Sequence, residues 1–315
     1  MEEWQFAFGV DENYVKYAGV MMTSIVLNHP GQPICFHVAC DGLNEADKGK
    51  LDEFTLLYRN TRIMIYDASA LLTSIPTPQV APERLNKSVF LRVLLPQFLP
   101  QELTKVIYLD ADMLCIGRLD LLWETALGEC AIGASFYAKD TEGHAKRLNL
   151  QPNIYFNAGL MVMNLPVWRQ QKLTQQVLAL YQNRVKDFLL LEQDALNCIL
   201  RGQIVPIAEK YNHMIDAFNP LLSKIQPEDA ILHFANEGKA WFRYPAEQIE
   251  QLYWRYVRRS LWFELEPLEP WDAKTAFLAG KNAQQRGDYQ AAAKYLGMAA
   301  RTFMEFYLQQ TGRIK

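Results

Sequence analysis

The chain has 315 residues, half of them hydrophobic, and a formal net charge of -3 at pH 7. This composition predicts a folded protein with a large core, and it argues against disorder and against a nucleic-acid partner. The five cysteines, an odd number, predict reduced buried thiols rather than a disulfide framework. Since no apolar stretch is long enough for a membrane span and no signal-like segment begins the chain, we expect a cytoplasmic protein.

Short apolar runs alternate with amphipathic segments over most of the sequence. Two clear amphipathic segments are 14–28 and 44–59, the second with Asn44 as its expected N-cap. Strand and helix in alternation predict βαβ units, hence an α/β fold with a mainly parallel sheet covered on both faces. The predicted strands are 4–10, 34–40, 62–68, 105–111, 130–136, 159–165, 203–209 and 230–235.

Acidic residues follow several of these strands. In parallel α/β sheets, ligands bind beyond the carboxyl ends of the strands. We therefore expect several carboxylates to gather at one edge of the sheet. The residues concerned are Asp11, Asp41, Asp67 and Asp110.

A pair of aspartates, Asp110 and Asp112, ends the strongly apolar run 106–109. If the extended conformation persists to Met113, both carboxylates point to the same side of the strand. Two such carboxylates repel each other unless a cation lies between them, and oxygen ligands suit Mg²⁺ or Mn²⁺. The alternative is a plain turn after a strand.

His233, at the end of another predicted strand, is the expected third ligand, and an imidazole favours Mn²⁺ over Mg²⁺. A histidine packed in the core is the alternative. Lys239 can reach a phosphate held by the same metal, or it is a solvated loop lysine.

A rival zinc site would use Cys35, His37 and Cys40. Strand alternation puts Cys40 on the opposite face, and no fourth ligand is close in sequence, so we interpret the segment as a buried strand. The sequence has no glycine-rich dinucleotide fingerprint, no Walker motif and no Gly-x-Ser-x-Gly elbow. Their absence weakens dehydrogenase, kinase and hydrolase readings.

The character of the sequence changes near residue 250. From 251 onward there are ten Lys and Arg against six Asp and Glu, and helical patterns only. We therefore divide the chain into 1–250 and a helical C-terminal region, 251–315. Aromatic and arginine side chains around Trp254 and Arg258 suit either a membrane interface or packing onto the body. The segment 276–303 has the spacing of one tetratricopeptide-like hairpin, which cannot form a solenoid alone.

Six segments together resemble a known family, the retaining sugar-nucleotide glycosyltransferases of family 8 with a GT-A fold. Each segment is weak evidence alone, but all six occur in the family's order, and the resemblance covers residues 4 to 242. The segments are "FGVDENYVKYAGVMMTSI", "SVFLRVLLPQFLP", "KVIYLDADMLCIGRLDLLW", "YFNAGLMVMNLPVWR", "EQDALN" and "HFANEGKAW".

The resemblance implies a role for each matching residue. Mn²⁺, with Mg²⁺ as the second choice, would be held by Asp110, Asp112 and His233. Glu192 and Gln193 would be catalytic, on the face of the anomeric carbon opposite the leaving group. The UDP-sugar would be bound by Gly9, Val10, Asp11, Asn13, Tyr14, Arg92, Asp110, Ala111, Asp112, Asn157, Ala158, Gly238 and Lys239.

Three positions depart from the family's pattern. Asn236 replaces a glycine and Ala240 a proline in the last motif, which leaves the phosphate cradle less defined. Glu192 stands where relatives commonly carry Asp, which adds a methylene to a crowded site.

The function implied is a retaining, metal-dependent transfer of glucose or galactose from a UDP-sugar to a saccharide. The expected acceptor is an oligosaccharide or lipid-linked glycan, such as a lipopolysaccharide or other cell-surface precursor. One alternative has the same chemistry on a protein or a soluble sugar; another is an inactive nucleotide-sugar-binding module. The C-terminal region adds two expectations, peripheral contact with the inner face of the membrane and homo-oligomer formation.

Overall fold

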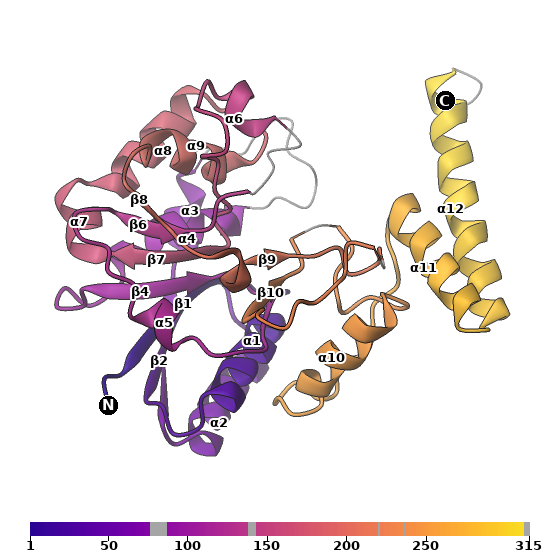
Figure 1. Cartoon of the computed structure of the whole chain (residues 1–315), viewed down its shortest axis with the longest axis horizontal. Coiled ribbons are helices and arrows are strands. Elements are labelled where there is room, and N and C mark those ends of the chain that lie inside the picture. Colours follow the sequence, from indigo (N-terminus) through magenta and orange to yellow (C-terminus); the bar gives the residue numbers. More distant parts are fainter. Residues whose placement is uncertain (76–86, 138–142, 220, 236, 312–315) are drawn as a thin grey trace.

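A computed structural model describes residues 1–75, 87–137, 143–219, 221–235 and 237–311 (Figure 1). Its main sheet has seven strands in the order β3-β2-β1-β4-β7-β6-β8. The strand β7 is antiparallel to both of its neighbours, and the other pairs are parallel, which confirms the expected mainly parallel sheet. The strands are β1 (Trp4–Asp11), β2 (Ile34–Asp41), β3 (Thr61–Asp67), β4 (Lys105–Leu109), β6 (Ile132–Ala134), β7 (Leu160–Asn164) and β8 (Ile204–Pro206).

Helices cover both faces of this sheet, because alternate side chains of its strands are apolar on both sides. Phe6 and Phe8 pack in one core cluster, and Ala7 belongs to the other. On the first face lie α1 (Val15–Asn28) and α2 (Glu45–Leu57). The second face is covered by α4 (Leu91–Leu94), α8 (Leu173–Asn183) and α9 (Leu191–Ile199). The expected N-cap is confirmed, since the Asn44 side chain accepts a hydrogen bond from the Asp47 backbone N–H.

Shorter helices connect these elements. They are α3 (Ser69–Thr73), α5 (Asp120–Trp123), α6 (His144–Arg147), α7 (Leu165–Gln170) and the 3-10 helices η1 (Lys87–Phe90), η2 (Leu95–Gln97) and η3 (Glu209–Tyr211).

A second sheet of three short strands lies against the first, in the order β5-β10-β9. It consists of β5 (Met113–Cys115), β10 (Ile231–His233) and β9 (His213–Met214). The turn 110–112 leads directly from β4 of the first sheet to β5 of the second. The predicted strand 105–111 is therefore shorter, since β4 ends at Leu109. A turn, not an extended segment that persists to Met113, carries the two aspartates.

The remaining predicted strands are found, with shorter bounds in the second half of the chain. The predicted 203–209 strand, for example, is extended only over Ile204–Pro206. The sequence did not predict β5 and β9, whose two or three residues are too few to show a periodic pattern. The expected gathering of acidic residues is confirmed for three of them, because Asp11 is the register partner of Asp41, and Asp67 pairs with Cys40 beside it. Asp110 follows β4, the neighbour of β1 on its other side.

The segment Cys35–Cys40 is a buried strand, as predicted. His37 lies in it with Nδ1 2.9 Å from the Tyr66 hydroxyl and Nε2 2.9 Å from Gln5 Oε1. All five cysteines are free, three of them buried and two partly buried. Among the described residues, no helix is long and apolar enough to cross a membrane.

The C-terminal region begins with α10 (Glu247–Val257), which packs against α1 through buried aromatic side chains. Trp262, 1% exposed, lies on Gly19 of α1 and donates its indole N–H to Asp47 Oδ1 at 3.1 Å. The sequence left two interpretations of this aromatic segment, a membrane interface or packing onto the body. The buried aromatic rings of α10 and Trp262 pack onto the body. The arginines of the same segment, Arg255, Arg258 and Arg259, are exposed.

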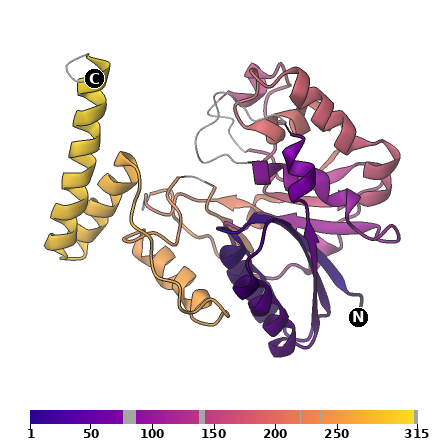
Figure 2. The same cartoon turned by 180° about the vertical axis from the view of Figure 1, so that it is seen from behind.

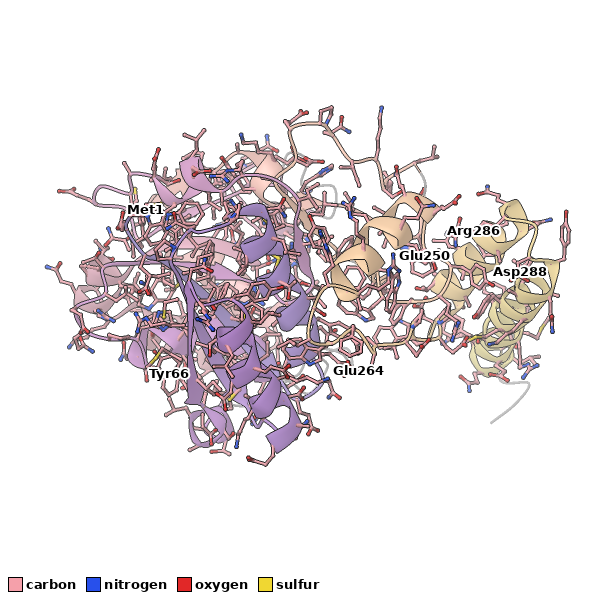
Figure 3. All side chains as sticks on the ribbon, turned by 90° about the horizontal axis from the view of Figure 1, so that it is seen from below. Met1, Tyr66, Glu250, Glu264, Arg286 and Asp288 are labelled. Carbon is pink, nitrogen blue, oxygen red and sulfur yellow. The ribbon has the colours of Figure 1, made fainter. Side chains whose placement is uncertain are left out.

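The last two helices, α11 (Ala273–Gln285) and α12 (Tyr289–Gln310), form the expected single hairpin, which stands away from the two sheets (Figures 1 and 2). Arg286 forms an ion pair with Glu250 of α10, and Figure 3 shows the two side chains between the helices. Tyr244 donates a hydrogen bond to Asp288 at the start of α12. The hairpin is thus tied to the body by polar contacts.

Candidate active site

Three ligand-type side chains meet where the two sheets join. One ligand atom from each of Asp110, Asp112 and His233 lies within 4.8 Å of the other two. His233 Nε2 is 3.2 Å from Asp112 Oδ1 and 4.0 Å from Asp110 Oδ2. The structure therefore brings together the three residues that the sequence proposed as metal ligands.

Backbone hydrogen bonds hold this arrangement. Since β10 is antiparallel to β5, His233 lies opposite Met113, and the next residue, Phe234, donates its N–H to the Asp112 carbonyl at 2.9 Å. The Asp110 N–H donates to the Gly159 carbonyl at 2.8 Å. Each ligand is therefore positioned by a strand end or the turn between the sheets, and Ala111 is the buried middle residue of that turn.

Gly159 is a site residue that the sequence reasoning missed. A Cβ atom there would lie 2.5 Å from His233 Cε1 and 2.8 Å from Asp110 Oδ2. Only glycine leaves room for the ligands at this position. The available signal was its place directly after Asn157 and Ala158, two predicted site residues.

The outer oxygens of both aspartates are held by cations or donors. Arg92 Nη2 lies 2.9 Å from Asp110 Oδ1, which also accepts the Tyr108 hydroxyl at 2.9 Å. Lys239 Nζ lies 2.6 Å from Asp112 Oδ2. Burial alone would raise the pKa of Asp112, but Lys239 and His233 outweigh it and hold that pKa well below the usual range. Asp112 is therefore a carboxylate at neutral pH.

Arg92 also connects the aspartates to the predicted catalytic helix α9. Its Nε lies 3.3 Å from Glu192 Oε1, and both residues are more than nine-tenths buried. Burial raises the pKa of Glu192 to about 7, against the opposing effect of Arg92. Glu192 can therefore change its protonation state near neutral pH.

Gln193 faces the strand end at Asn157 and Ala158. Its Oε1 accepts the Ala158 N–H at 2.9 Å and lies 3.4 Å from Asn157 Nδ2. Its Nε2 donates to the Tyr155 hydroxyl at 3.0 Å, which in turn donates to Asp194 at 2.7 Å. The sequence reasoning did not include Tyr155 and Asp194 among the site residues, because their partners lie on separate elements.

The predicted nucleotide-binding residues lie at the end of β1. Asp11 Oδ1 accepts the N–H groups of Asn13 and Tyr14 at 2.9 and 3.0 Å, which shapes the start of α1. Gly9 allows close approach of Leu91 in α4, because a Cβ atom would lie 2.6 Å from Leu91 Cβ. Val10 points into the core, so only its backbone faces this edge.

Tyr14 is the residue directly before α1, and the charges of Asp112 and Asp110 act on its hydroxyl. Its ring packs edge-on against Trp241, with centroids 6.0 Å apart. Burial, helped by the charge of Asp112, raises the pKa of the Tyr14 hydroxyl well above its usual value. The side chain therefore offers a neutral ring and hydroxyl at the mouth of the site.

The loop after β10 carries Lys239, which also donates to the Phe234 carbonyl at 2.7 Å. Gly238 before it packs against Phe218, where a Cβ atom would come within 2.6 Å of the ring. Its φ angle is not positive, so contact rather than conformation requires a glycine here. Asn236, the departure noted in the sequence, lies outside the described residues.

The donor set fits a divalent cation. Two carboxylate oxygens and one imidazole nitrogen converge, while the other oxygens of both carboxylates are held by Arg92, Tyr108 and Lys239. Mixed oxygen and imidazole ligands suit Mn²⁺ better than Mg²⁺. His233 Nδ1, on the far side of the ring, lies 2.8 Å from Asn212 Oδ1.

A mainly parallel sheet with a candidate cation site after its fourth strand is typical of glycosyltransferases with the GT-A fold. The chain belongs to glycosyl transferase family 8, whose sequence model matches residues 5–244. The expected family and fold are confirmed.

Among curated relatives, the lipopolysaccharide 1,3-galactosyltransferase of Salmonella typhimurium is 23% identical over 306 residues, covering 93% of this chain and 89% of the relative. A lipopolysaccharide 1,2-glucosyltransferase of Escherichia coli is 26% identical over 274 residues, covering 83% of this chain and 79% of the relative. Among solved structures, the galactosyltransferase LgtC superimposes with a TM-score of 0.70 at 23% identity, over 82% of this chain and 96% of that chain. This last likeness shows the shared fold.

Proposed function

We propose that this glycosyltransferase moves a hexose from a UDP-sugar to a saccharide acceptor with retention of anomeric configuration. The observation that supports the proposal most is the cluster of Asp110, Asp112 and His233 beside two cationic side chains, Lys239 and Arg92. A diphosphate is the group that a divalent ion and such cations bind together. Mn²⁺, or Mg²⁺ as the second choice, would neutralise the charge that develops on the departing diphosphate.

The chain's own residues have the following proposed roles. Asp110, Asp112 and His233 hold the metal, and Lys239 donates to a phosphate oxygen. Asn157, Ala158, Gly238 and Ala111 line the donor pocket, and Gly9, Val10, Asp11, Asn13 and Tyr14 form its nucleoside end. Arg92 keeps its charge between Asp110 and Glu192 and orients the sugar and diphosphate. Gln193 presents its amide oxygen, and Glu192 its carboxyl group, to the positive charge that develops at the anomeric carbon.

The proposed sugar is glucose or galactose, and the proposed acceptor is a lipopolysaccharide or other cell-surface glycan precursor. This rests on the names of the relatives, which are lipopolysaccharide galactosyl- and glucosyltransferases. The alternative is that the same reaction uses a protein or a soluble sugar as its acceptor. The cluster of oriented side chains weighs against an inactive binding module.

For the C-terminal region we propose peripheral contact with the inner face of the membrane. Because the aromatic rings around α10 are mostly buried, the exposed arginines Arg255, Arg258 and Arg259 and the 65% exposed Phe263 are the groups available for it. The division into a catalytic domain, 1–250, and a helical region, 251–315, stays a prediction, as does homo-oligomer formation.

The test of the proposed function is UDP release from a panel of UDP-sugars, with Mn²⁺ or with EDTA. The wild type should release UDP from one hexose donor only with the metal, and Asp112→Asn should be inactive. The anomeric configuration of the transferred sugar, followed by NMR, tests retention. No metal-dependent release and no metal-dependent UDP binding across the panel would refute the proposal.

A further inference from the structure

We propose that Asn212 is a positioning residue that selects the tautomer of His233 and so prepares its Nε2 to bind the metal. The inference rests on the proposed function in taking His233 as a metal ligand. Asn212 is 3% exposed and lies between η3 and β9, where its N–H donates to the Glu209 carbonyl at 2.8 Å. Because β9 pairs with β10, the backbone carries Asn212 to the far side of the His233 ring.

The direction of the hydrogen bonds follows from a backbone donor. The Gly159 N–H, which can only donate, lies 2.9 Å from the side-chain atom of Asn157 assigned as Oδ1. That atom must therefore be the amide oxygen. Asn212 approaches the same oxygen at 3.0 Å, so the Asn212 atom that faces it must be its NH₂ group.

A second backbone N–H group, that of Ala158, indicates the same orientation of the Asn157 amide. The Ala158 N–H lies 2.9 Å from Gln193 Oε1, which identifies that atom as an amide oxygen. The other atom of the Asn157 amide faces this oxygen at 3.4 Å and must be the NH₂ group. The orientation of Asn157, and through it that of Asn212, is thus determined by two peptide N–H groups.

This orientation of Asn212 determines which atom faces His233 Nδ1. With its NH₂ group directed to Asn157, Asn212 presents its oxygen to His233 Nδ1 at 2.8 Å. An amide oxygen only accepts, so Nδ1 carries a proton, and Nε2 is the ring nitrogen left to give a lone pair to a metal. Nε2 faces Asp112 Oδ1, 3.2 Å away, and Asp110 Oδ2, 4.0 Å away.

The other tautomer would oppose metal binding. A proton on Nε2 would form a hydrogen bond with Asp112 Oδ1, and neither atom could then bind the metal. Asn212 disfavours the neutral tautomer with its proton on Nε2, since the Asn212 oxygen would then face an Nδ1 lone pair. Asn212 therefore prepares the metal site from outside, without contact to the metal itself.

The first test reads the tautomer without metal or activity. Protein labelled with ¹⁵N-histidine, in EDTA and at a pH raised until the His233 ring carries a single proton, gives the protonated nitrogen from long-range ¹H–¹⁵N correlations. His233→Gln assigns the signal. The proton should be on Nδ1 in the wild type and should move largely to Nε2 in Asn212→Leu. If the single proton of the wild-type ring were on Nε2, the inference would be overturned whatever the variants do.

The second test measures Mn²⁺ affinity from the electron paramagnetic resonance signal of the free ion. Asn212→Leu should bind Mn²⁺ about 10- to 100-fold more weakly, and Asn212→Asp, which keeps an acceptor for Nδ1–H, should retain more affinity. Asn282→Leu is the matched control, since Asn282 is also buried with two hydrogen bonds but lies in α11. Equal Mn²⁺ affinity in wild type and Asn212→Leu would overturn the inference.

The inference and the proposed function can fail separately. An Nδ1–H tautomer that depends on Asn212, in a protein that binds Mn²⁺ but transfers no sugar, supports the inference and refutes the function. Turnover of a UDP-sugar by a protein in which the neutral His233 carries its proton on Nε2 supports the function and refutes the inference.

Discussion

The two oxygens of Asp112 have different partners: Oδ1 faces His233 Nε2 at 3.2 Å, and Oδ2 accepts from Lys239 Nζ at 2.6 Å. One carboxylate thus serves both the proposed metal site and the loop that follows β10. The ammonium group neutralises part of the charge that would attract a metal ion. At the same time, it lies where a phosphate bound to that metal would meet it.

Lys239→Ala should therefore separate metal binding from turnover. Without the ammonium, Asp112 should attract Mn²⁺ more strongly in the absence of nucleotide, because a like charge has been removed. The rate of transfer should fall about 10²- to 10³-fold, as for the loss of one donor to a developing charge. Titration of free Mn²⁺ and UDP-release assays measure the two effects. Lys274→Ala, at an exposed position of α11, is the control, and parallel losses in both assays would contradict this account.

Gly159→Ala should abolish metal binding while most of the fold survives. The added methyl group would lie within 2.8 Å of Asn157 Oδ1 and Asp110 Oδ2, which must then move apart. Calorimetric titration with Mn²⁺ should show no binding, and circular dichroism should show native secondary structure. Gly297→Ala in α12, where a Cβ atom meets open space, is the control; it should bind Mn²⁺ normally and gain about 0.5–1 kcal/mol in stability.

Glu192→Gln should change how stability depends on pH in the metal-free protein. The pKa of this carboxyl rises from 4.5 to about 7 on folding, so the folded state keeps a proton that the unfolded state releases. Wild-type stability should therefore decrease as pH rises between these two values, by up to roughly 3 kcal/mol. The variant should lack this decrease in urea unfolding series, whereas the exposed Glu305→Gln should retain it. Identical pH profiles for all three proteins would contradict the raised pKa.

Charge reversal should test the proposed membrane contact. Arg255, Arg258 and Arg259 are exposed, and each basic residue near an anionic surface contributes about 1 kcal/mol. The triple Glu variant should pellet much less with anionic vesicles than the wild type. Reversal of Lys274, Lys281 and Arg301, exposed on the hairpin, is the matched control. Equal pelleting of all three proteins would rule out the contact. Truncation at residue 250 is unsuitable, because it removes the buried Trp262.

The sequence could predict most of the strands and the candidate metal ligands because both depend on local pattern. Asp110 and Asp112 follow a strongly apolar strand, and His233 ends another. The family's motifs added Arg92 and Gln193, whose local sequence is not distinctive.

Other site residues could not be predicted, because their roles depend on contacts between distant segments. Asn212 meets His233 only through the pairing of β9 with β10, and β9 has just two residues. Gly159 is required by the volume of side chains from two other elements. The burial of Trp262 depends on a gap left by Gly19 in a helix near the other end of the chain.

The junction between the two sheets combines residues that are synthesised at different times. Asp110 and Asp112 are synthesised before the midpoint of the chain, but His233 and Lys239 follow much later. A growing chain that has completed its first four strands and the turn 110–112 holds the two aspartates and lacks the imidazole and the ammonium group. The candidate metal site is therefore complete only when the second sheet has assembled, and an incomplete chain has only part of the proposed donor site.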